Sequence, residues 1–193
     1  NSSGRISVVA VVSGNSVNEL NELGLWSNGM SSDGDLKLVA RQGNHAPGSN
    51  RDFVFGTFLE PSINAAGQTV FMALGYQLDN GSVIDSAFGI WGENRAGVLT
   101  LVARAGQEVT LDTNDHRTIA SLSFASNSGG EDGHGSGLND LGQVVFHATF
   151  TDGSSGIVIS DALTVPEAST IALLTFAAGC FASINQLRHR ENR

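Results

Sequence analysis

The chain has 193 residues, of which 40% are apolar, and it carries a formal net charge of -9. This length normally forms one domain, or one domain with an appendage, and it is long enough to bury a core. The acidic charge argues against nucleic acid as a partner, since phosphate backbones require a basic surface, and the single cysteine, Cys180, excludes an intrachain disulfide and a zinc site of the CxxC type.

The first predicted element is a turn followed by a strand, and this pair recurs twice along the chain. The turn has the pattern Asn-x-x-Gly, in which the Asn side chain can bond its own backbone and the Gly accepts a positive φ. The fifth, seventh and ninth positions after the Asn lie two residues apart, so they share one face of the strand. The seventh position is apolar and the ninth is Ala in all three copies. The motif residues are Asn1 and Gly4, with Val8 where the other two copies have Phe; Asn64, Gly67 and Phe71; and Asn139, Gly142 and Phe146.

Two further segments recur in the same order after the turns. They are the triplets Gly24-Leu-Trp26, Gly89-Ile-Trp91 and, more weakly, Gly156-Ile-Val158, and the stretches Leu36–Gly43 and Leu99–Gly106. The copies of the turn start 63 and 75 residues apart. The twelve extra residues fit a Gly-rich, acidic loop insertion around Ala125–Gly137.

These repeats predict an all-β body over residues 1–163, built from four-stranded units that start near residues 1, 64 and 139. In the second unit we expect strands near Gly67–Tyr76, Ser86–Trp91, Val98–Arg104 and Thr118–Ala125. Four short strands are the size of one propeller blade, so the pattern favours a partial β-propeller-like array, with a β-sandwich as the alternative. Because a closed propeller needs at least four blades, we interpret the chain as a fragment of a longer repeat protein.

Residues 164–193 form a predicted tail of different composition. The 18 residues 170–187 carry no charge, and as a helix they would span about 27 Å at ~1.5 Å per residue, enough for a thin bilayer. Arg188 and Arg190 follow at once, and by the positive-inside rule they hold the end of the chain in the cytoplasm and the body outside it. This pattern predicts one C-terminal transmembrane helix; a buried core helix is the alternative.

The tail resembles a PEP-CTERM sorting signal, which combines a Val-Pro-Glu-Pro-Ser-like motif, one transmembrane helix and a short Arg-rich end. The matching residues are Val165, Pro166, Glu167, Ala168, Ser169, Arg188 and Arg190, with Ala168 where the family usually has a second Pro. The resemblance implies export by a Gram-negative-type bacterium, often one that makes exopolysaccharide. It also implies that an exosortase, a membrane-embedded protease or transpeptidase, recognises the tail.

The body resembles the choice-of-anchor tandem-repeat proteins, which are marked by an Asn-x-x-Gly-x-x-x-Ala/Phe-like motif. The three turns described above carry this resemblance. Such proteins bear different surface anchors in different bacteria, which agrees with a sorting tail of this kind. The resemblance therefore implies a repeat protein displayed at a cell surface.

Several further residues are candidates for chemistry. Asp33-Gly-Asp35 and Glu131-Asp132-Gly133-His134 could offer oxygen ligands to Ca²⁺, but neither follows a known calcium-loop spacing, so solvated turns are favoured. His147 falls on the strand face opposite Phe146, where a packed or half-exposed side chain is favoured over a catalytic base. We therefore expect no catalytic, cofactor-binding or metal-binding residues.

The recurring Arg41 and Arg104, and the recurring Trp26 and Trp91, allow two interpretations. The arginines could bind an anionic glycan, but a structural contact with loop carbonyls or a neighbouring Asp is favoured. The tryptophans could stack on sugar rings, but a place in the core is favoured.

The sequence thus predicts a non-enzymatic, exported bacterial surface protein of structural, adhesion or matrix type. Its tail would hold it in the membrane until an exosortase-type enzyme acts, with exopolysaccharide as a further candidate partner and no cofactor. The alternative is an extracellular glycan-binding module, or a glycan-active enzyme, on a propeller-like scaffold.

Overall fold

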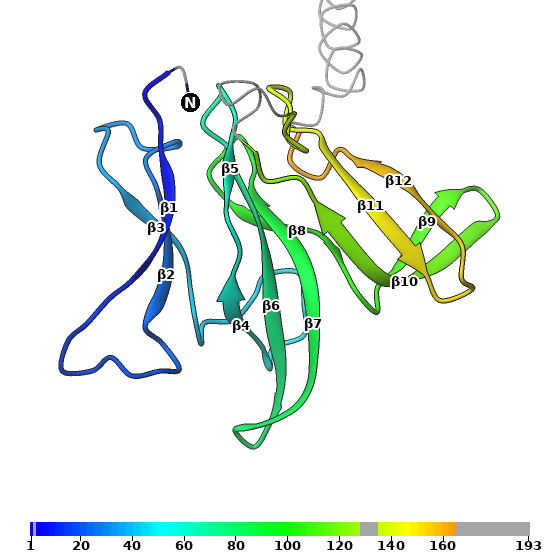
Figure 1. The fold of residues 1–193 in the computed structure, drawn as a ribbon, viewed down its shortest axis with the longest axis horizontal. Helices are drawn as coiled ribbons and strands as arrows, with labels where there is room; N and C mark the ends of the chain where they lie inside the picture. The colour runs from blue at the N-terminus through cyan, green and yellow to red at the C-terminus, as the bar shows by residue number, and fades with distance from the viewer. Residues whose placement is uncertain (2, 128–134, 165–193) are drawn as a thin grey trace, which may run out of the picture.

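The computed structural model describes residues 1, 3–127 and 135–164. Its described residues form twelve β-strands in three antiparallel sheets, which stand side by side in chain order (Figure 1). The prediction of an all-β body is therefore confirmed. Within the described ranges no helix is long and apolar enough to cross a membrane, and the helix predicted over 170–187 lies outside these residues.

The first sheet has the order β1-β2-β3 and the second has the order β4-β6-β7-β8, with β5 also paired to β6. The first contains β1 (Ser7–Val11), β2 (Leu23–Ser27) and β3 (Lys37–Arg41). The second contains β4 (Phe53–Phe58), β5 (Ser62–Ile63), β6 (Thr69–Asp79), β7 (Ser82–Glu93) and β8 (Leu99–Arg104). The third has the order β12-β11-β10-β9. Its strands are β9 (Glu108–Asp112), β10 (Asp115–Phe124), β11 (Val144–Phe150) and β12 (Ser155–Ser160).

The sequence repeats correspond to equivalent strands. Strands β1, β6 and β11 follow the three Asn-x-x-Gly turns, and each pairs with the strand that carries the Gly-x-Trp or Gly-x-Val triplet, namely β2, β7 and β12. On their other side, β6 pairs with β4 and β11 pairs with β10. At the turns of Asn64 and Asn139, the strand that precedes the turn therefore belongs to the same sheet as the strand that follows it.

This pairing corrects the predicted grouping of strands. The strand expected near Thr118–Ala125 corresponds to the later part of β10, which ends at Phe124. It pairs with β11 of the third sheet, not with the strands of the second unit. The reason is the turn itself: the Asn-x-x-Gly turn folds the chain back, so the incoming and outgoing strands become neighbours. Strands β4 and β9 had not been predicted.

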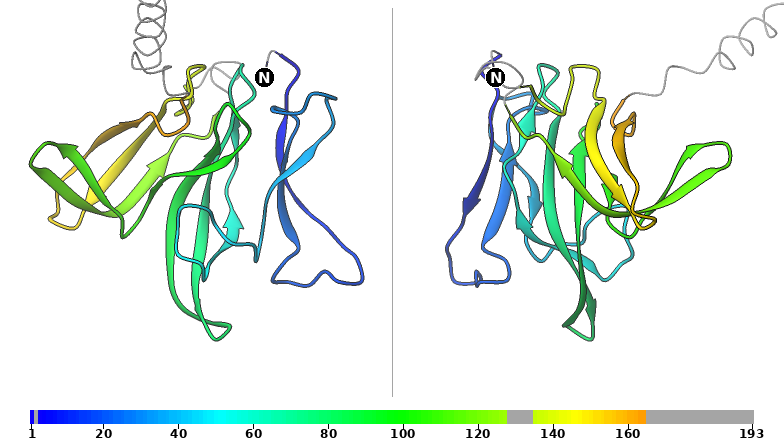
Figure 2. Two further views of the ribbon diagram at one scale, coloured as in Figure 1. Left: turned by 180° about the vertical axis from the view of Figure 1, so that it is seen from behind. Right: turned by 45° about the vertical axis from the view of Figure 1, so that its right-hand side comes forward.

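The second sheet is covered on both of its faces. We call the face that carries the seventh residue after the Asn (Val8, Phe71 or Phe146) the front face of a sheet, and the opposite face its rear face. The front face of the second sheet packs on the rear face of the first, and its rear face packs on the front face of the third (Figure 2). The first core contains Leu25, Ala40, Ala46, Phe53, Phe55, Phe58, Phe71, Ala73 and Trp91. The second contains Val70, Ile90, Ala103, Ile119, Leu122, Leu138, Val144, Phe146, Ala148, Phe150 and Leu163.

Each front face carries a row of registered side chains across its strands. In the second sheet Phe71 lies opposite Trp91, and Trp91 lies opposite Leu101. The equivalent row in the first sheet joins Val8, Trp26 and Leu38 in the same register. The glycine two residues before each Trp makes room for it, because a Cβ at Gly89 would meet the Trp91 ring. The Gly-x-Trp triplet is thus a packing motif.

Candidate functional site: the open side of the first sheet

The Asn-x-x-Gly turns have the same local geometry in all three copies. The Gly N–H donates to the Asn carbonyl oxygen over 2.9 Å at Gly4, 3.0 Å at Gly67 and 3.1 Å at Gly142. The Asn side-chain oxygen accepts from the N–H four residues on, as in the 2.8 Å bond from Gln68 to Asn64. All three glycines have a positive φ, between 69° and 90°. The Asn and Gly of the motif thus shape the turn in the same way in each copy.

The same asparagines also connect neighbouring sheets. Asn1 Nδ2 donates to the carbonyl oxygen of Asn64 over 2.7 Å, and Asn64 Nδ2 donates to the carbonyl oxygen of Asn139 over 2.9 Å. The Ala65 N–H adds a 2.9 Å bond to the Asp140 carboxylate. The turns thus form a ladder that runs across one end of the three sheets.

Arg5 reinforces this end of the first and second sheets. Its Nη1 donates to the carbonyl oxygens of Gly29 and, over 3.1 Å, of Ala66. A Cβ at Gly67 would collide with this guanidinium and with the Gly29 carbonyl. Gly67 is therefore required for two reasons, its φ of 90° and the close approach of the neighbouring sheet.

The outer edge of β1 has no strand beside it among the described residues. In β6, the backbone N–H and C=O of residues an even number of positions after Asn64 point toward β4 and β5. The Gln68 carbonyl accepts from Asn64 N–H, and the Met72 carbonyl accepts from Leu59 N–H. The equivalent residues in β1 are Arg5, Ser7 and Val9. The backbone groups of residues an odd number of positions after Asn1 point toward β2, as the bond from Asn28 N–H to the Ile6 carbonyl shows. The backbone of Ser7 and Val9 therefore faces an open edge.

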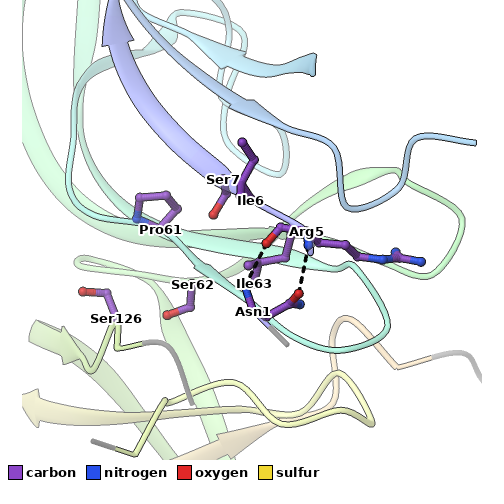
Figure 3. Close-up of a pocket in the computed structure, with 8 residues that line it drawn as sticks. All are labelled: Asn1, Arg5, Ile6, Ser7, Pro61, Ser62, Ile63 and Ser126. Atoms are coloured by element: carbon purple, nitrogen blue, oxygen red, sulfur yellow. Dashed lines mark hydrogen bonds between the residues drawn. The ribbon is translucent and has the colours of Figure 1, made fainter. Parts of the chain in front are cut away.

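Two grooves run along this edge. One has a volume of about 240 Å³ and lies between Arg5–Ser7 and the segment Pro61–Ile63, with Ser126 at its border (Figure 3). The other has a volume of about 410 Å³ and lies between Ser7–Val9 and Phe58–Pro61. Strands β4 and β10 occupy the matching edge in the second and third sheets. The grooves are therefore suited to an extended strand that pairs with β1.

The front face of the first sheet is uncovered as well. Ile6, Val8 and Leu38 are 51%, 40% and 48% exposed, whereas Phe71, the counterpart of Val8, is fully buried. The difference arises because the first sheet packs on the front of the second, while no described sheet lies in front of the first. Apolar side chains gathered on one face in this way are typical of an interaction surface.

One buried acid lies behind this region. Glu93 is 8% exposed, and its Oε2 atom has no hydrogen-bond partner among the described residues. Burial raises the pKa of Glu93, and hydrogen bonds with Thr69 partly oppose this effect. The hydroxyls of Thr69 and Ser27 are hydrogen-bonded to each other over 2.7 Å, which links the first two sheets.

The recurring Trp and Arg residues have structural contacts. Trp91 is fully buried and its Nε1 donates to the Pro47 carbonyl over 3.0 Å, whereas Trp26 is half-buried on the open front face. Arg41 Nε donates to the Asn21 carbonyl over 2.9 Å, and the Arg104 guanidinium lies 4.7 Å from the centre of the Phe53 ring. Trp91 and Arg41 thus have the favoured kinds of contact, a place in the core and a loop carbonyl. Trp26 does not lie in a core, and Arg104 contacts an aromatic ring and not a carbonyl or an Asp.

The remaining candidates are dispersed. His147 lies on the rear face of β11, opposite to Phe146 as predicted, but it is exposed and not packed or half-exposed. Asp33 pairs with Lys37 over 2.7 Å in an exposed turn. In the described part of the chain, no three His, Cys, Asp or Glu residues gather where they could hold a metal ion. Residues 131–134, and the sorting-signal residues Val165–Ser169, Arg188 and Arg190, lie outside the described residues.

Sequence reasoning missed the role of Gln68. Its amide nitrogen donates to the carbonyl oxygens of Glu93 and Leu163, over 3.2 Å and 2.9 Å, and so links the second sheet to the end of the third unit. A Gln also stands four residues after Asn139, at Gln143. This recurrence was the available signal. Glu93 had no such signal, because its burial depends on the packing of two sheets.

Comparison with known proteins gives one family. No curated protein and no solved structure matches the chain. A family model described as a family of unknown function, DUF7453, matches residues 1–172, which include the whole described body. The chain therefore belongs to the DUF7453 family.

Proposed function

We propose that this chain is an exported, non-enzymatic bacterial surface protein of structural, adhesion or matrix type, with a body that forms part of a β-propeller-like array. The observation that carries the proposal is how the repeated residues are used. The Asn-x-x-Gly turns join one sheet to the next, and so do the front-face residues of the second and third sheets and the middle residues Leu25 and Ile90 of the Gly-x-Trp triplets. Radial repetition of this kind protects the edges of sheets and builds large, stable surfaces.

The tail supplies the second part of the proposal. The uncharged stretch 170–187 followed by Arg188 and Arg190 supports a membrane anchor with the body outside the cytoplasm. The PEP-CTERM-like residues Val165–Ser169 support recognition by an exosortase-type enzyme. The body would then be displayed at the membrane and passed to the cell surface or extracellular matrix.

The anchor is tested by one substitution in the full chain, fused to an export leader and a tag before Asn1. Ala178→Arg places a charge near the middle of the uncharged stretch, which costs about 2.5 to 3.5 kcal/mol of insertion free energy. We expect this variant to leave the membrane fraction, while the control Ala178→Leu stays there and its tag is digested by external protease. Equal membrane retention of the two variants would contradict the anchor.

A further inference from the structure

The two contacts between sheets use the same pair of surfaces. Leu25, on the rear face of the first sheet, shares a core with Phe71 on the front face of the second. Ile90, on the rear face of the second sheet, shares a core with Phe146 on the front face of the third. Leu25 and Ile90 are equivalent positions in the Gly-x-Trp triplets. A rear face meeting a front face is therefore the assembly rule of this chain.

Each end of the array exposes one half of this contact. At the front of the first sheet, Val8 is 40% exposed where its counterpart Phe71 is fully buried. At the rear of the third sheet, Ile157 is 68% exposed where its counterpart Ile90 is fully buried. The views in Figure 2 place the first and third sheets at opposite sides of the second. The chain thus displays both partners of its own sheet-to-sheet contact.

Both exposed faces carry apolar side chains of the kind that is buried between the sheets. On the rear face of the third sheet, Val145 lies opposite Ile159 and His147 lies opposite Ile157. Ile159 is 63% exposed and Val145 is 38% exposed. Neither the row of Val8, Trp26 and Leu38 nor these four positions contains an Asp, Glu, Lys or Arg. Arg41, opposite Gly24, stands beside this row on the front face, and its Nε is already bonded to the Asn21 carbonyl. The positions named here therefore bring no charge of their own into the contact.

We propose that a second copy of this chain covers the front face of the first sheet with the rear face of its own third sheet. The contact is head-to-tail. A single contact therefore leaves one front face, on the second copy, and one rear face, on the first copy, uncovered. Two copies related by a twofold axis form the contact twice and close the ring. Counting only the described sheets, this ring would hold six, three from each copy, which lies within the range of four to eight propeller blades.

The oligomeric state of the full chain in detergent tests this proposal, by sedimentation velocity. We expect a dimer. Val8→Asp and Ile157→Asp lie at opposite ends of the array. Each should abolish the dimer, because each places a charge on one face of both contacts in the ring. Val83→Asp is the control, since Val83 is 58% exposed at the end of the β6–β7 hairpin, away from both faces, and it should remain dimeric.

A second measurement identifies which faces meet. Val8→Cys and Ile157→Cys are made in separate full chains that carry Cys180→Ser, and the two chains are mixed in membranes and treated with a bifunctional maleimide. We expect a covalent dimer only in the mixture of the two chains. In a closed ring, a chain that carries both Val8→Cys and Ile157→Cys should give covalent dimers and no longer cross-linked species. A monomeric wild-type chain would overturn the proposal and leave the front face to a preceding unit of a longer polypeptide. A dimer that links Val8→Cys to itself would overturn the head-to-tail arrangement.

Discussion

The side-chain amide of Asn64 donates a 2.9 Å hydrogen bond to the backbone carbonyl of Asn139, 75 residues further along the chain. Asn64 and Asn139 are the same residue of the repeat motif, and Asn1 makes the equivalent bond to Asn64. The residue that shapes each turn therefore also fixes the distance to the next sheet. The local repeat and the stacking of sheets are in this way one structural feature.

The first prediction isolates this contact between sheets. Asn64→Ala removes the bond to Asn139, while Asn139→Ala removes the same turn bonds on an exposed residue. Asn64 is 5% exposed, so its loss leaves buried backbone groups without partners. We expect Asn64→Ala to lower the free energy of unfolding by about 1 to 3 kcal/mol more than Asn139→Ala does. Equal losses in urea denaturation would show that only the turn matters.

The second prediction concerns the turn glycine. Gly67→Val forces a β-branched residue into a φ of 90° and against the Arg5 guanidinium. We expect the melting temperature to fall by well over ten degrees, or the body to fail to fold, because backbone strain and collision add. Ala66→Val, at the exposed neighbouring position, is the control and should change the melting temperature little. Similar effects of the two changes would contradict the turn geometry.

The third prediction compares the two tryptophans. Trp91→Ala removes a fully buried ring that contacts Phe55 edge-on, with 5.1 Å between ring centres. We expect a loss of about 3 to 5 kcal/mol in the free energy of unfolding. Trp26→Ala should cost clearly less, because Trp26 is half-buried on the open front face. Guanidinium denaturation of both variants measures the difference, and a larger cost at Trp26 would mean that another surface already covers it.

The fourth prediction follows from the pKa of Glu93. Burial raises this pKa above the ordinary 4.5, so above pH 4.5 the folded chain binds more protons than the unfolded chain, and stability falls as the pH rises through the window up to the folded pKa. Glu93→Gln removes this pH-dependent loss of stability. We expect the variant to match the wild type near pH 4 and to become progressively more stable than it as the pH rises.

Thermal denaturation across pH 4 to 8 checks this expectation. Glu108→Gln, which changes an exposed side chain on β9, is the control and should follow the wild-type curve. A Glu93→Gln variant that is less stable than the wild type at pH 7 would contradict it, since the charged carboxylate would then be stabilising.

The turns and the strand faces could be predicted from the sequence because they are local. The Asn-x-x-Gly pattern contains the side chain that closes the turn, and the two-residue spacing of Thr69, Phe71 and Ala73 already places them on one face, where all three are buried. Trp91 could likewise be placed in a core, because it recurs with a small residue two positions earlier.

The partners of each strand could not be predicted in the same way. Thr118–Phe124 reads as a strand from its composition, but nothing within it says whether it pairs with β8 or with β11. That choice depends on the turn at Asn139, which lies beyond a long connection. The same front-face position is buried at Phe71 and open at Val8. Exposure here depends on the neighbouring sheet, not on the residue.

Hydrogen exchange of the β1 backbone amides, measured residue by residue, tests most directly whether the first sheet is open. Because odd offsets from Asn1 face β2, we expect strong protection at Val8 and Ala10 and weak protection at Ser7 and Val11. Val70 and Leu74, the counterparts of Ser7 and Val11, lie opposite β5 and β4 and should be protected. Equal protection along the whole of β1 would mean that another strand already occupies this edge, and would contradict the open first sheet.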